Sequence, residues 1–358
     1  MTATDEEKER VRKYYREKMR DRRARLKAAQ DPTEPKVLTG PRSTKQQVDE
    51  TISHIYKGMG LATYDTAELY DVQAVSSYLE RGYQTKAGYK LYSKASLKTK
   101  YSAIVAYLRD RPEDEGSEAE QDRQHALKLY RAKMYDLAKE IDGEKKKNQK
   151  SERDLKNWAD WSEIQGIGAD NIENSIYKLT YLLYTEMPPR RTEYKSLKIL
   201  FNPGKKQLDN KEKYPGNYLV LSATGLTIQY ILLRDYKTSG RKGDYIVRLT
   251  TKLRKAFDEV IQDEHGFIQD EEYVFPEHLR EEGQWTHHLN RLFKKYLSKE
   301  ISVNILRKAY VTWWLQSKQR TYEEKEALAW AMGTSVYELE TSYMKIDDGH
   351  DSDDPLCC

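Results

Sequence analysis

Residues 171–200 read NIENSIYKLTYLLYTEMPPRRTEYKSLKIL, a stretch in which a helix ends and the first strand of a sheet begins. The segment up to Met187 has the apolar periodicity of a helix. Pro188 and Pro189 end that helix, because proline lacks a backbone N–H and fixes the direction in which the chain leaves. The run YKSLKIL that follows is typical of a short strand. This stretch therefore predicts that the second half of the chain combines helices with a sheet.

The rest of the second half continues in a simple order. Three more strand-like runs follow, NYLVLS, TIQYILLR and DYIVRLT, and they are rich in β-branched and aromatic residues. Four helical runs are also present: TTKLRKAFDEVIQ, WTHHLNRLFKKYLS, VNILRKAYVTWWLQS and YEEKEALAWAMG. Few strand–helix–strand signals of a parallel sheet occur. We therefore expect an α+β domain with a small antiparallel sheet and a helical bundle.

The first half of the chain is predicted to be mainly helical. At 358 residues the chain is too long for one typical core, so two domains and tails are expected. Apolar residues recur at helical spacing in TAELYDVQAVSSYLER and SLKTKYSAIVAYLRD. Trp158 and Trp161 predict a connecting helix that packs against the second domain. The expected division is a basic arm and linker over 1–46, a helical domain over 47–150, a connecting helix over 151–165, a mixed domain over 166–346 and an acidic tail over 347–358.

The composition is that of a polar globular protein, with 38% hydrophobic and 34% charged residues. No apolar run approaches the roughly 18–20 residues that span a bilayer. The N-terminus lacks the apolar centre of a signal peptide. We therefore expect an intracellular protein that is not secreted and has no membrane partner. Cys357 and Cys358 are the only cysteines and predict neither a disulfide nor a metal site; a prenylation signal stays an alternative for this terminal pair.

Charge is segregated along the chain, although the net charge is only +4. Residues 10–27 hold ten Lys and Arg against Glu17 and Asp21, whereas the last twelve residues hold five Asp and no basic residue. The basic arm favours a polyanion partner, and the acidic end suggests a solvated or autoinhibitory flap. A disordered tail that serves only solubility is the alternative for the acidic end.

A lysine series in the first half gives a second reason to expect a polyanion. From Tyr83 to Tyr101 the chain has no acidic residue, and tyrosines alternate with lysines about four residues apart. Such lysines fall on one face of a helix, and the aromatic rings add stacking surface. The pattern favours contact with a phosphate backbone, with a solvated lysine face as the alternative. The predicted DNA-binding residues are Lys86, Lys90, Lys94, Lys98 and Lys100.

Two segments in the second half carry cationic side chains that can contact a phosphate or donate a proton. Arg190 and Arg191 follow the double proline, and an arginine there can contact a phosphate in bidentate fashion. Lys237 lies at the start of a predicted hairpin, DYKTSGRKGDYIV. It can reach into a DNA groove or protonate a leaving oxygen. Taken singly, each feature is also explained by an ordinary exposed side chain.

Two further places follow in the helical bundle. Arg307 lies early in an apolar helix, where an arginine needs a partner charge. Tyr343 closes the run MGTSVYELETSY and lies ten positions after Gly333, but it is one of 28 tyrosines. No G-x-x-x-x-G-K-[ST] or G-x-G-x-x-G motif occurs, which argues against chemistry driven by a nucleotide.

In their order and spacing these features resemble the tyrosine recombinase (integrase) family. The catalytic domain of that family begins with Arg-x-x-Glu, continues through a hairpin lysine and His-x-x-Arg, and closes with a Leu-Gly-His-Ser-type turn and a tyrosine. The matching segments here are Arg190–Glu193, Lys237, Asn304–Arg307, Met332–Ser335 and Tyr343. The resemblance covers about residues 166–346, and more weakly the preceding helices as a core-binding domain. Its wording is most similar to integrases of eukaryotic DNA viruses, virophages and related mobile elements.

The resemblance implies a site-specific DNA recombinase that cleaves and rejoins strands through a 3′-phosphotyrosyl intermediate. It implies Arg190, Lys237, Arg307 and Tyr343 as catalytic residues, with Arg190 rather than Arg191 as the first arginine. It implies double-stranded DNA as the partner and a tetramer of the chain on that DNA. It places the protein at DNA, in a host nucleus or cytoplasm or with a virion. Neither a metal nor another cofactor is expected.

Two positions depart from the family pattern. Asn304 stands where the family has its first histidine, and Thr334 stands where it has the second. Neither side chain transfers protons near neutral pH, so both are expected to support catalysis only, together with Arg191. Proton transfer is then expected to rest on Lys237, on a water or on a nearby histidine.

Several alternatives stay open. His287 and His288 are the histidines that could transfer a proton, with exposed polar positions as the alternative for both. For the whole protein, one alternative is a nicking and resealing enzyme like topoisomerase IB. Another is a catalytically decayed DNA-binding protein on the recombinase fold.

Overall fold

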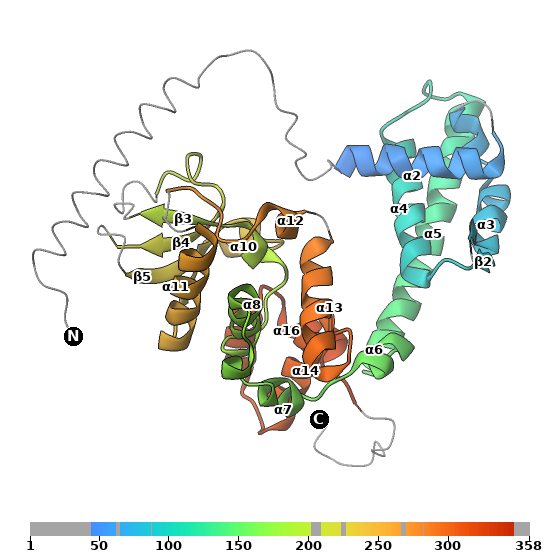
Figure 1. The fold of residues 1–358 in the computed structure, drawn as a ribbon. Helices are drawn as coiled ribbons and strands as arrows, with labels where there is room; N and C mark the ends of the chain where they lie inside the picture. Colours follow the sequence, from blue (N-terminus) through green and yellow to red (C-terminus); the bar gives the residue numbers. More distant parts are fainter. Residues whose placement is uncertain are drawn as a thin grey trace, which may run out of the picture. The chain divides into compact units, whose positions relative to one another are not determined.

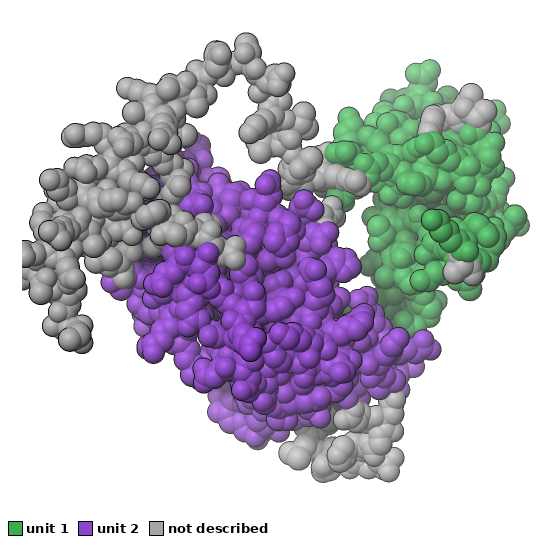
Figure 2. Space-filling view, in the orientation of Figure 1, with its two compact units in different colours: residues 1–145 green, residues 146–358 purple. Residues whose placement is uncertain are grey.

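The computed structural model forms two compact units, Met1–Lys145 and Lys146–Cys358 (Figure 2). The structure describes residues 44–61, 65–86, 88–201, 209–222, 227–265, 270–281 and 283–346. The units divide after Lys145, whereas the sequence prediction places the boundary at 150. The predicted basic arm, the linker up to residue 43 and the acidic tail with its two cysteines lie outside the described residues.

Unit 1 is built from helices around one core (Figure 1). Buried residues from each long helix meet there, including Ile55, Leu79, Ile104 and Tyr130. Fully burying one such apolar side chain stabilises the fold by about 1.5–3 kcal/mol. The helices of this unit are α2 (Thr44–Met59), the 3₁₀ turn η1 (Thr66–Leu69), α3 (Val72–Arg81), α4 (Lys94–Arg109) and α5 (Glu118–Lys146).

A short hairpin separates α3 from α4. β1 (Tyr83–Thr85) pairs antiparallel with β2 (Gly88–Lys90). Gly82 enters it with a φ of 88°, and a Cβ at this position would lie 2.3 Å from the backbone oxygen of Lys90. Only glycine fits both conditions, so the hairpin is fixed by local sequence.

The hairpin breaks up the predicted lysine face, and the prediction that five lysines share one side of a helix is wrong in its geometry. Lys86 and Lys90 belong to the hairpin and are exposed, whereas the other three lysines lie on α4. Lys94 forms ion pairs with two glutamates of α5 at 2.8 and 2.7 Å. The Lys100 Nζ lies 4.4 Å from the ring centroid of Tyr92, and burial lowers the pKa of Lys100.

Unit 2 is built on a four-stranded sheet of order β3-β4-β5-β6. The β3–β4 pair is parallel and the two other pairs are antiparallel, so the sheet is mixed. The four strands lie where the sequence predicts them, and the α+β fold class is confirmed. Their bounds are β3 (Leu197–Phe201), β4 (Asn217–Leu221), β5 (Ile228–Leu233) and β6 (Tyr245–Arg248).

Helices of unit 2 join the sheet in one large core. α8 packs against α11, and their residues Leu183 and Phe257 meet Ile199 and Ile231 of the sheet. None of the helices in the described ranges is long and apolar enough to cross a membrane. The helical elements are α6 (Glu152–Asn157), α7 (Trp161–Gly166), η2 (Ala169–Asn171), α8 (Ser175–Thr185), η3 (Glu193–Ser196), α10 (Ser239–Lys242), α11 (Thr251–His265), α12 (Glu277–Arg280), α13 (Gln284–Leu297), α14 (Val303–Gln316), α15 (Tyr322–Ala331), α16 (Val336–Glu338) and a π-helical turn η4 (Leu339–Tyr343).

The predicted single connecting helix over 151–165 is instead two short helices, α6 and α7. Ser151 starts α6 with a capping box. The backbone of Trp158 is extended, with φ −67° and ψ 135°, and this conformation ends α6. Trp161 then begins α7 and is buried in the core of unit 2, so its predicted packing role is confirmed.

Candidate active site

The turn that follows α15 organises the candidate site. Gly333 has a φ of 62°, and a Cβ there would lie 3.0 Å from Nη2 of Arg190. Its N–H donates to the carbonyl of Trp330 at 3.1 Å, and the N–H of Thr334 donates to that of Ala329 at 2.8 Å. A positive φ favours glycine, so Gly333 is needed both for the turn and for the approach of the arginine.

Arg190 lies buried against this turn, with 1% of its surface exposed. Its Nη1 donates to the carbonyl of Ala331 at 2.7 Å. Its guanidinium lies 4.7 Å from the ring centroid of Tyr236 and 4.6 Å from that of Tyr245. Nε and Nη2 of Arg190 have no hydrogen-bond partner among the described residues.

Arg307 reaches the same turn from α14 and is completely buried. Its Nη1 donates to the carbonyls of Pro189 at 2.8 Å and Met332 at 3.0 Å. As in Arg190, Nε and Nη2 have no partner within the described ranges. Burial lowers the pKa of Arg307, and Arg191 lowers it further, whereas Tyr343 raises it.

Tyr343 packs against the Arg307 guanidinium. Its ring centroid lies 4.5 Å from the Arg307 guanidinium, and 9% of the residue is exposed. The residue ends the π-helical turn η4, and the chain then stays with unit 2. The N–H of Lys345 donates to the Thr312 hydroxyl at 2.9 Å, and that of Ile346 donates to the carbonyl of Asn148 at 3.0 Å. These bonds fix the backbone directly after the tyrosine.

Two more cations complete the cluster. Nη1 of Arg191 donates to the carbonyl of Gly333 at 2.8 Å. Nζ of Lys242 donates to the carbonyls of Thr334 at 2.6 Å and Ala329 at 3.1 Å. Burial lowers the pKa of Lys242, and the neighbouring charges of Arg190 and Arg191 lower it further. We call Arg190, Arg191, Lys242 and Arg307 the cation cluster.

The structure brings Lys242, and not Lys237, to the cluster. Lys237 is exposed, and none of the hydrogen bonds between described residues joins it to residues 329–334. Lys242 ends α10, where Gly243 turns the chain with a φ of 73° and the Tyr236 hydroxyl donates to the Gly243 carbonyl at 2.6 Å. The sequence places both lysines in one hairpin, and only the conformation of that hairpin distinguishes them.

The three predicted supporting residues differ in position. Arg191 contacts the turn directly, as described above. Thr334 is buried, but its bonds to the cluster run through its backbone carbonyl. Asn304 lies exposed in the first turn of α14. The structure therefore joins Arg190, Arg191, Arg307, Thr334 and Tyr343, while Asn304 and Lys237 remain on the surface.

The two histidines of α13 are also separated by their environments. His287 is exposed, as the alternative for it predicts. His288 is buried, 3.0 Å from the Thr180 hydroxyl, so an exposed position is wrong for this residue. Burial lowers the pKa of His288 to about 4. Its contacts with Trp285 and Tyr177 belong to the core.

Glu193 is the buried carboxylate beside the cluster. Both of its side-chain oxygens lack a hydrogen-bond partner among the described residues. Its charge raises the pKa of Arg307. One carboxylate offsets only part of the charge of four neighbouring cations, so the site keeps a net positive charge.

The free donors define what the site can bind. Nε and Nη2 form the side-on edge of a guanidinium, and that edge makes paired hydrogen bonds to carboxylate or phosphate oxygens. Arg190 and Arg307 both use Nη1 for the protein and keep this edge free. A buried charged donor without a partner costs more than the about 1–3 kcal/mol of a neutral one. The arrangement therefore suits a bound oxyanion.

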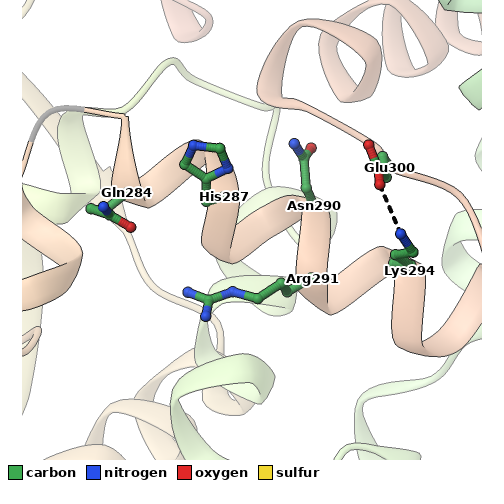
Figure 3. A pocket seen from close by; sticks show the side chains of 6 residues that line it. All are labelled: Gln284, His287, Asn290, Arg291, Lys294 and Glu300. Carbon is green, nitrogen blue, oxygen red and sulfur yellow. Dashed lines mark hydrogen bonds and ion pairs between the residues drawn. The ribbon is translucent and has the colours of Figure 1, made fainter.

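A shallow pocket lies elsewhere in unit 2, along α13 (Figure 3). Figure 3 shows side chains of α13 projecting around it, and Lys294 pairs with Glu300 at 2.9 Å. Oδ1 of Asn290 is buried there without a partner in the described part of the chain. The lining residues are Gln284, His287, Asn290, Arg291, Lys294 and Glu300.

Metal ligands are not gathered in the described part of the chain. No group of three or more His, Cys, Asp or Glu residues lies close enough there to hold a metal ion.

Comparison with known proteins gives distant structural likenesses only. No family model matches the chain, and no curated protein matches it. The crystal structure of XerA recombinase is similar over 86% of this chain and 89% of that chain, with 14% identity and a TM-score of 0.37. The Tn1549 transposon integrase in complex with circular intermediate DNA is similar over 84% and 95%, with 14% identity and a TM-score of 0.35. Likeness at this level assigns neither a family nor an activity to this chain.

Proposed function

We propose that this protein cleaves and rejoins DNA strands, with Tyr343 as the nucleophile and the cation cluster as the phosphate site. One observation carries the proposal: two buried arginines keep their side-on edges free, and Tyr343 lies over one of them. A phosphodiester is the anion that both arginines and a tyrosine can act on together. Preorganised cations stabilise the charge that grows on the non-bridging oxygens during attack.

The reaction is a transfer of one ester bond. The Tyr343 oxygen attacks phosphorus, its proton leaves to water, and the bond between phosphorus and the 5′ oxygen breaks. The products are a 3′-phosphotyrosyl link and a 5′-hydroxyl, so the bond energy is kept for rejoining. In the reverse direction a 5′-hydroxyl attacks the link and releases Tyr343. No oxidant or reductant is involved.

Lys242 is the residue that we assign to protonation of the leaving 5′ oxygen, in place of Lys237. Its Nζ is held by two carbonyls of the turn that holds the arginines. Its lowered pKa makes it a readier proton donor than an ordinary lysine. Arg190 and Arg307 are assigned to the phosphate oxygens.

The pocket of α13 is proposed as a second DNA contact. Gln284, Asn290 and Arg291 offer the amide and guanidinium groups that pair with base edges in a major groove. Lys86 and Lys90 of the hairpin are proposed to contact phosphates. The other three lysines of the predicted series stay candidates, although Lys94 and Lys100 have partners within unit 1.

Site-specific recombination is the form of this activity that we favour. It requires double-stranded DNA and a tetramer of the chain, and it places the protein at DNA in a nucleus, in a cytoplasm or with a virion. A virus or related mobile element is the proposed source, on the wording of the motifs. Nicking and resealing like that of topoisomerase IB uses the same site and is distinguished by the absence of strand exchange.

A second candidate is DNA binding without cleavage. It is favoured by the two residues that stand where the family has histidines. Asn304 is exposed, and Thr334 contacts Lys242 through its backbone. Neither side chain supplies an imidazole to the phosphate site. This candidate predicts DNA binding that is unaffected by the removal of the Tyr343 hydroxyl and no covalent product.

The test is a search for a covalent protein–DNA adduct. Because the target sequence is unknown, the full chain is incubated with a pool of duplexes that carry a randomised centre and a nick beside it. Cleavage near the nick releases a short strand and traps the adduct. We expect a denaturant-resistant adduct with the native chain and none with Tyr343→Phe.

Tyr337→Phe is the matched control, because Tyr337 is an exposed tyrosine six positions earlier in the chain. It should form the adduct as the native chain does. Equal adduct yields with Tyr343→Phe would overturn the assignment of the nucleophile. Absence of any adduct with the native chain, together with retained DNA binding, would favour the second candidate.

A further inference from the structure

Trp330 is a large aromatic residue left exposed at the edge of the cation cluster. It lies on α15, and 42% of its surface is exposed. The reaction proposed above gives it no role. Tryptophan is enriched in binding surfaces, because its large ring is apolar and its N–H is polar.

Contacts tie the indole to the phosphate site. Nζ of Lys242 lies 5.3 Å from the Trp330 ring centroid. The Tyr245 ring centroid lies 6.5 Å from that of Trp330, and the Arg190 guanidinium lies 4.6 Å from the Tyr245 ring centroid. Cations and rings therefore form one continuous group from buried Arg190 to exposed Trp330.

The backbone fixes this position as well. The carbonyls on either side of residue 330 hold two of the cations, because Ala329 accepts from Lys242 and Ala331 accepts from Arg190. The Trp330 carbonyl accepts from Gly333 at 3.1 Å. The backbone of residue 330 is therefore fixed beside Lys242 and Arg190.

Trp313 shows that exposure alone does not make such a site. It is exposed to a similar extent, 40%, but it packs against Trp161 and Tyr310. Trp330 differs in having cations as neighbours. A ligand that uses both the arginines and Trp330 needs an anionic group with a flat apolar face beside it, and a nucleotide has both.

We propose that Trp330 stacks on the base of the nucleotide that flanks the phosphate bound by Arg190 and Arg307. The assignment rests on the proposed function and adds a base-binding subsite to it. Stacking accepts any base, because every base has a π-face, so the subsite favours an unstacked nucleotide without reading its sequence. A nucleotide freed from its pairing beside a cleavage point meets that requirement.

The experiment uses two probes of equal charge. One is a thymidine trinucleotide, and the other is the same backbone with abasic residues. Calorimetric titration of the full chain should give about tenfold tighter binding of the thymidine probe, as base stacking predicts. Trp330→Ala should bind both probes equally, at the affinity that the native chain has for the abasic one. Trp330→Phe should keep part of the preference.

Trp313→Ala is the control and should keep the full preference. The proposal is overturned if Trp330→Ala still prefers the thymidine probe, or if it loses affinity for both probes alike, which marks a structural role. Thermal unfolding of each variant, with Trp330→Phe as the conservative form, detects a folding defect. Loss of binding in Arg307→Ala with an unchanged preference in Trp330→Ala would leave the phosphate site standing and remove only the subsite.

Discussion

Buried arginines occur in both units, and they are satisfied in opposite ways. Arg123 of unit 1 is 5% exposed, and its Nε and Nη2 donate to the Glu120 carboxylate at 2.7 and 2.6 Å. Its Nη1 donates to the carbonyl of Leu108 at 2.8 Å. Arg190 and Arg307 of unit 2 likewise use Nη1 for carbonyls, but their side-on edges have no partner among the described residues.

The difference separates an arginine that is fully paired within the protein from two arginines that have donors left for a ligand. Arg123 supplies the pattern of a satisfied guanidinium: one carbonyl and one paired carboxylate. Arg190 and Arg307 also donate to a carbonyl, but they lack the paired carboxylate. In the proposed reaction, the DNA phosphate takes the place that the Glu120 carboxylate has beside Arg123. Substitution of Arg123 should therefore affect mainly folding, whereas substitution of Arg190 or Arg307 should affect activity most.

The largest expected effect is on cleavage. Arg307→Ala should lower the rate of adduct formation by about 10²–10³-fold, the loss typical for one preorganised donor at a developing charge. Its loss of stability should be partly offset, because the carbonyls of Pro189 and Met332 lose a donor while two buried donors that lack a partner are removed. Single-turnover cleavage measures the rate, and calorimetry measures the melting temperature. A variant that unfolds and cleaves normally when folded would contradict the comparison.

Arg123→Ala should show the reverse behaviour. It leaves Glu120 without its paired partner and the buried Leu108 carbonyl without a donor, so the free energy of unfolding should fall. The arginine lowers the pKa of Glu120 to about 2, so the pair contributes stability above the ordinary carboxylate pKa and loses it as pH falls. Urea titration measures the loss. Cleavage by the folded fraction should be normal.

Lys242 and Lys237 allow a comparison between a lysine of the cation cluster and an exposed lysine of the same hairpin. Lys242→Ala should slow cleavage by about 10²-fold, within the range of a lost general acid. Lys237→Ala, an exposed lysine of the same hairpin, should leave the rate unchanged. The native rate should also fall as pH rises through the lowered pKa of Lys242, because the neutral amine cannot donate. Equal effects of the two substitutions would remove the assignment.

The smallest expected effect concerns His288, a buried polar group satisfied by Thr180. Its pKa of about 4 lies below the ordinary 6.5, so the unfolded chain binds a proton that the folded chain does not. Stability should fall by about 2–3 kcal/mol between pH 6.5 and 4 and then level off for this group. Denaturant titrations at several pH values measure the slope. His288→Gln should flatten it, and His287→Gln, the exposed neighbour, should not.

Much of the fold could be predicted because each element carries a local signal. The double proline after α8 and the aromatic and β-branched strands specify themselves within a few residues. The parallel β3–β4 pair could not be predicted in this way, since it depends on where the chain returns after residue 201. The hairpin that follows Gly82 could not be predicted, because the spacing of the lysines in that segment also suits a helix.

Parts of the site were also beyond local patterns. Arg307 could be singled out because an arginine in an apolar helix needs a partner, whereas Tyr343 is singled out only by the resemblance of the motif order to the tyrosine recombinase family. Lys242 could not be chosen over Lys237, because the turn of α10 decides which amine meets the carbonyls. The free edges of the arginines become visible only when every donor has been assigned a partner.

Identification of the residue that carries the DNA tests directly whether Tyr343 is the nucleophile. The adduct trapped from the nicked duplex pool is digested with protease and nuclease, and the modified peptide is sequenced by mass spectrometry. We expect a single nucleotide-linked peptide, with the phosphate ester on Tyr343. An ester on any other of the 28 tyrosines, or on a serine, would exclude Tyr343 as the nucleophile.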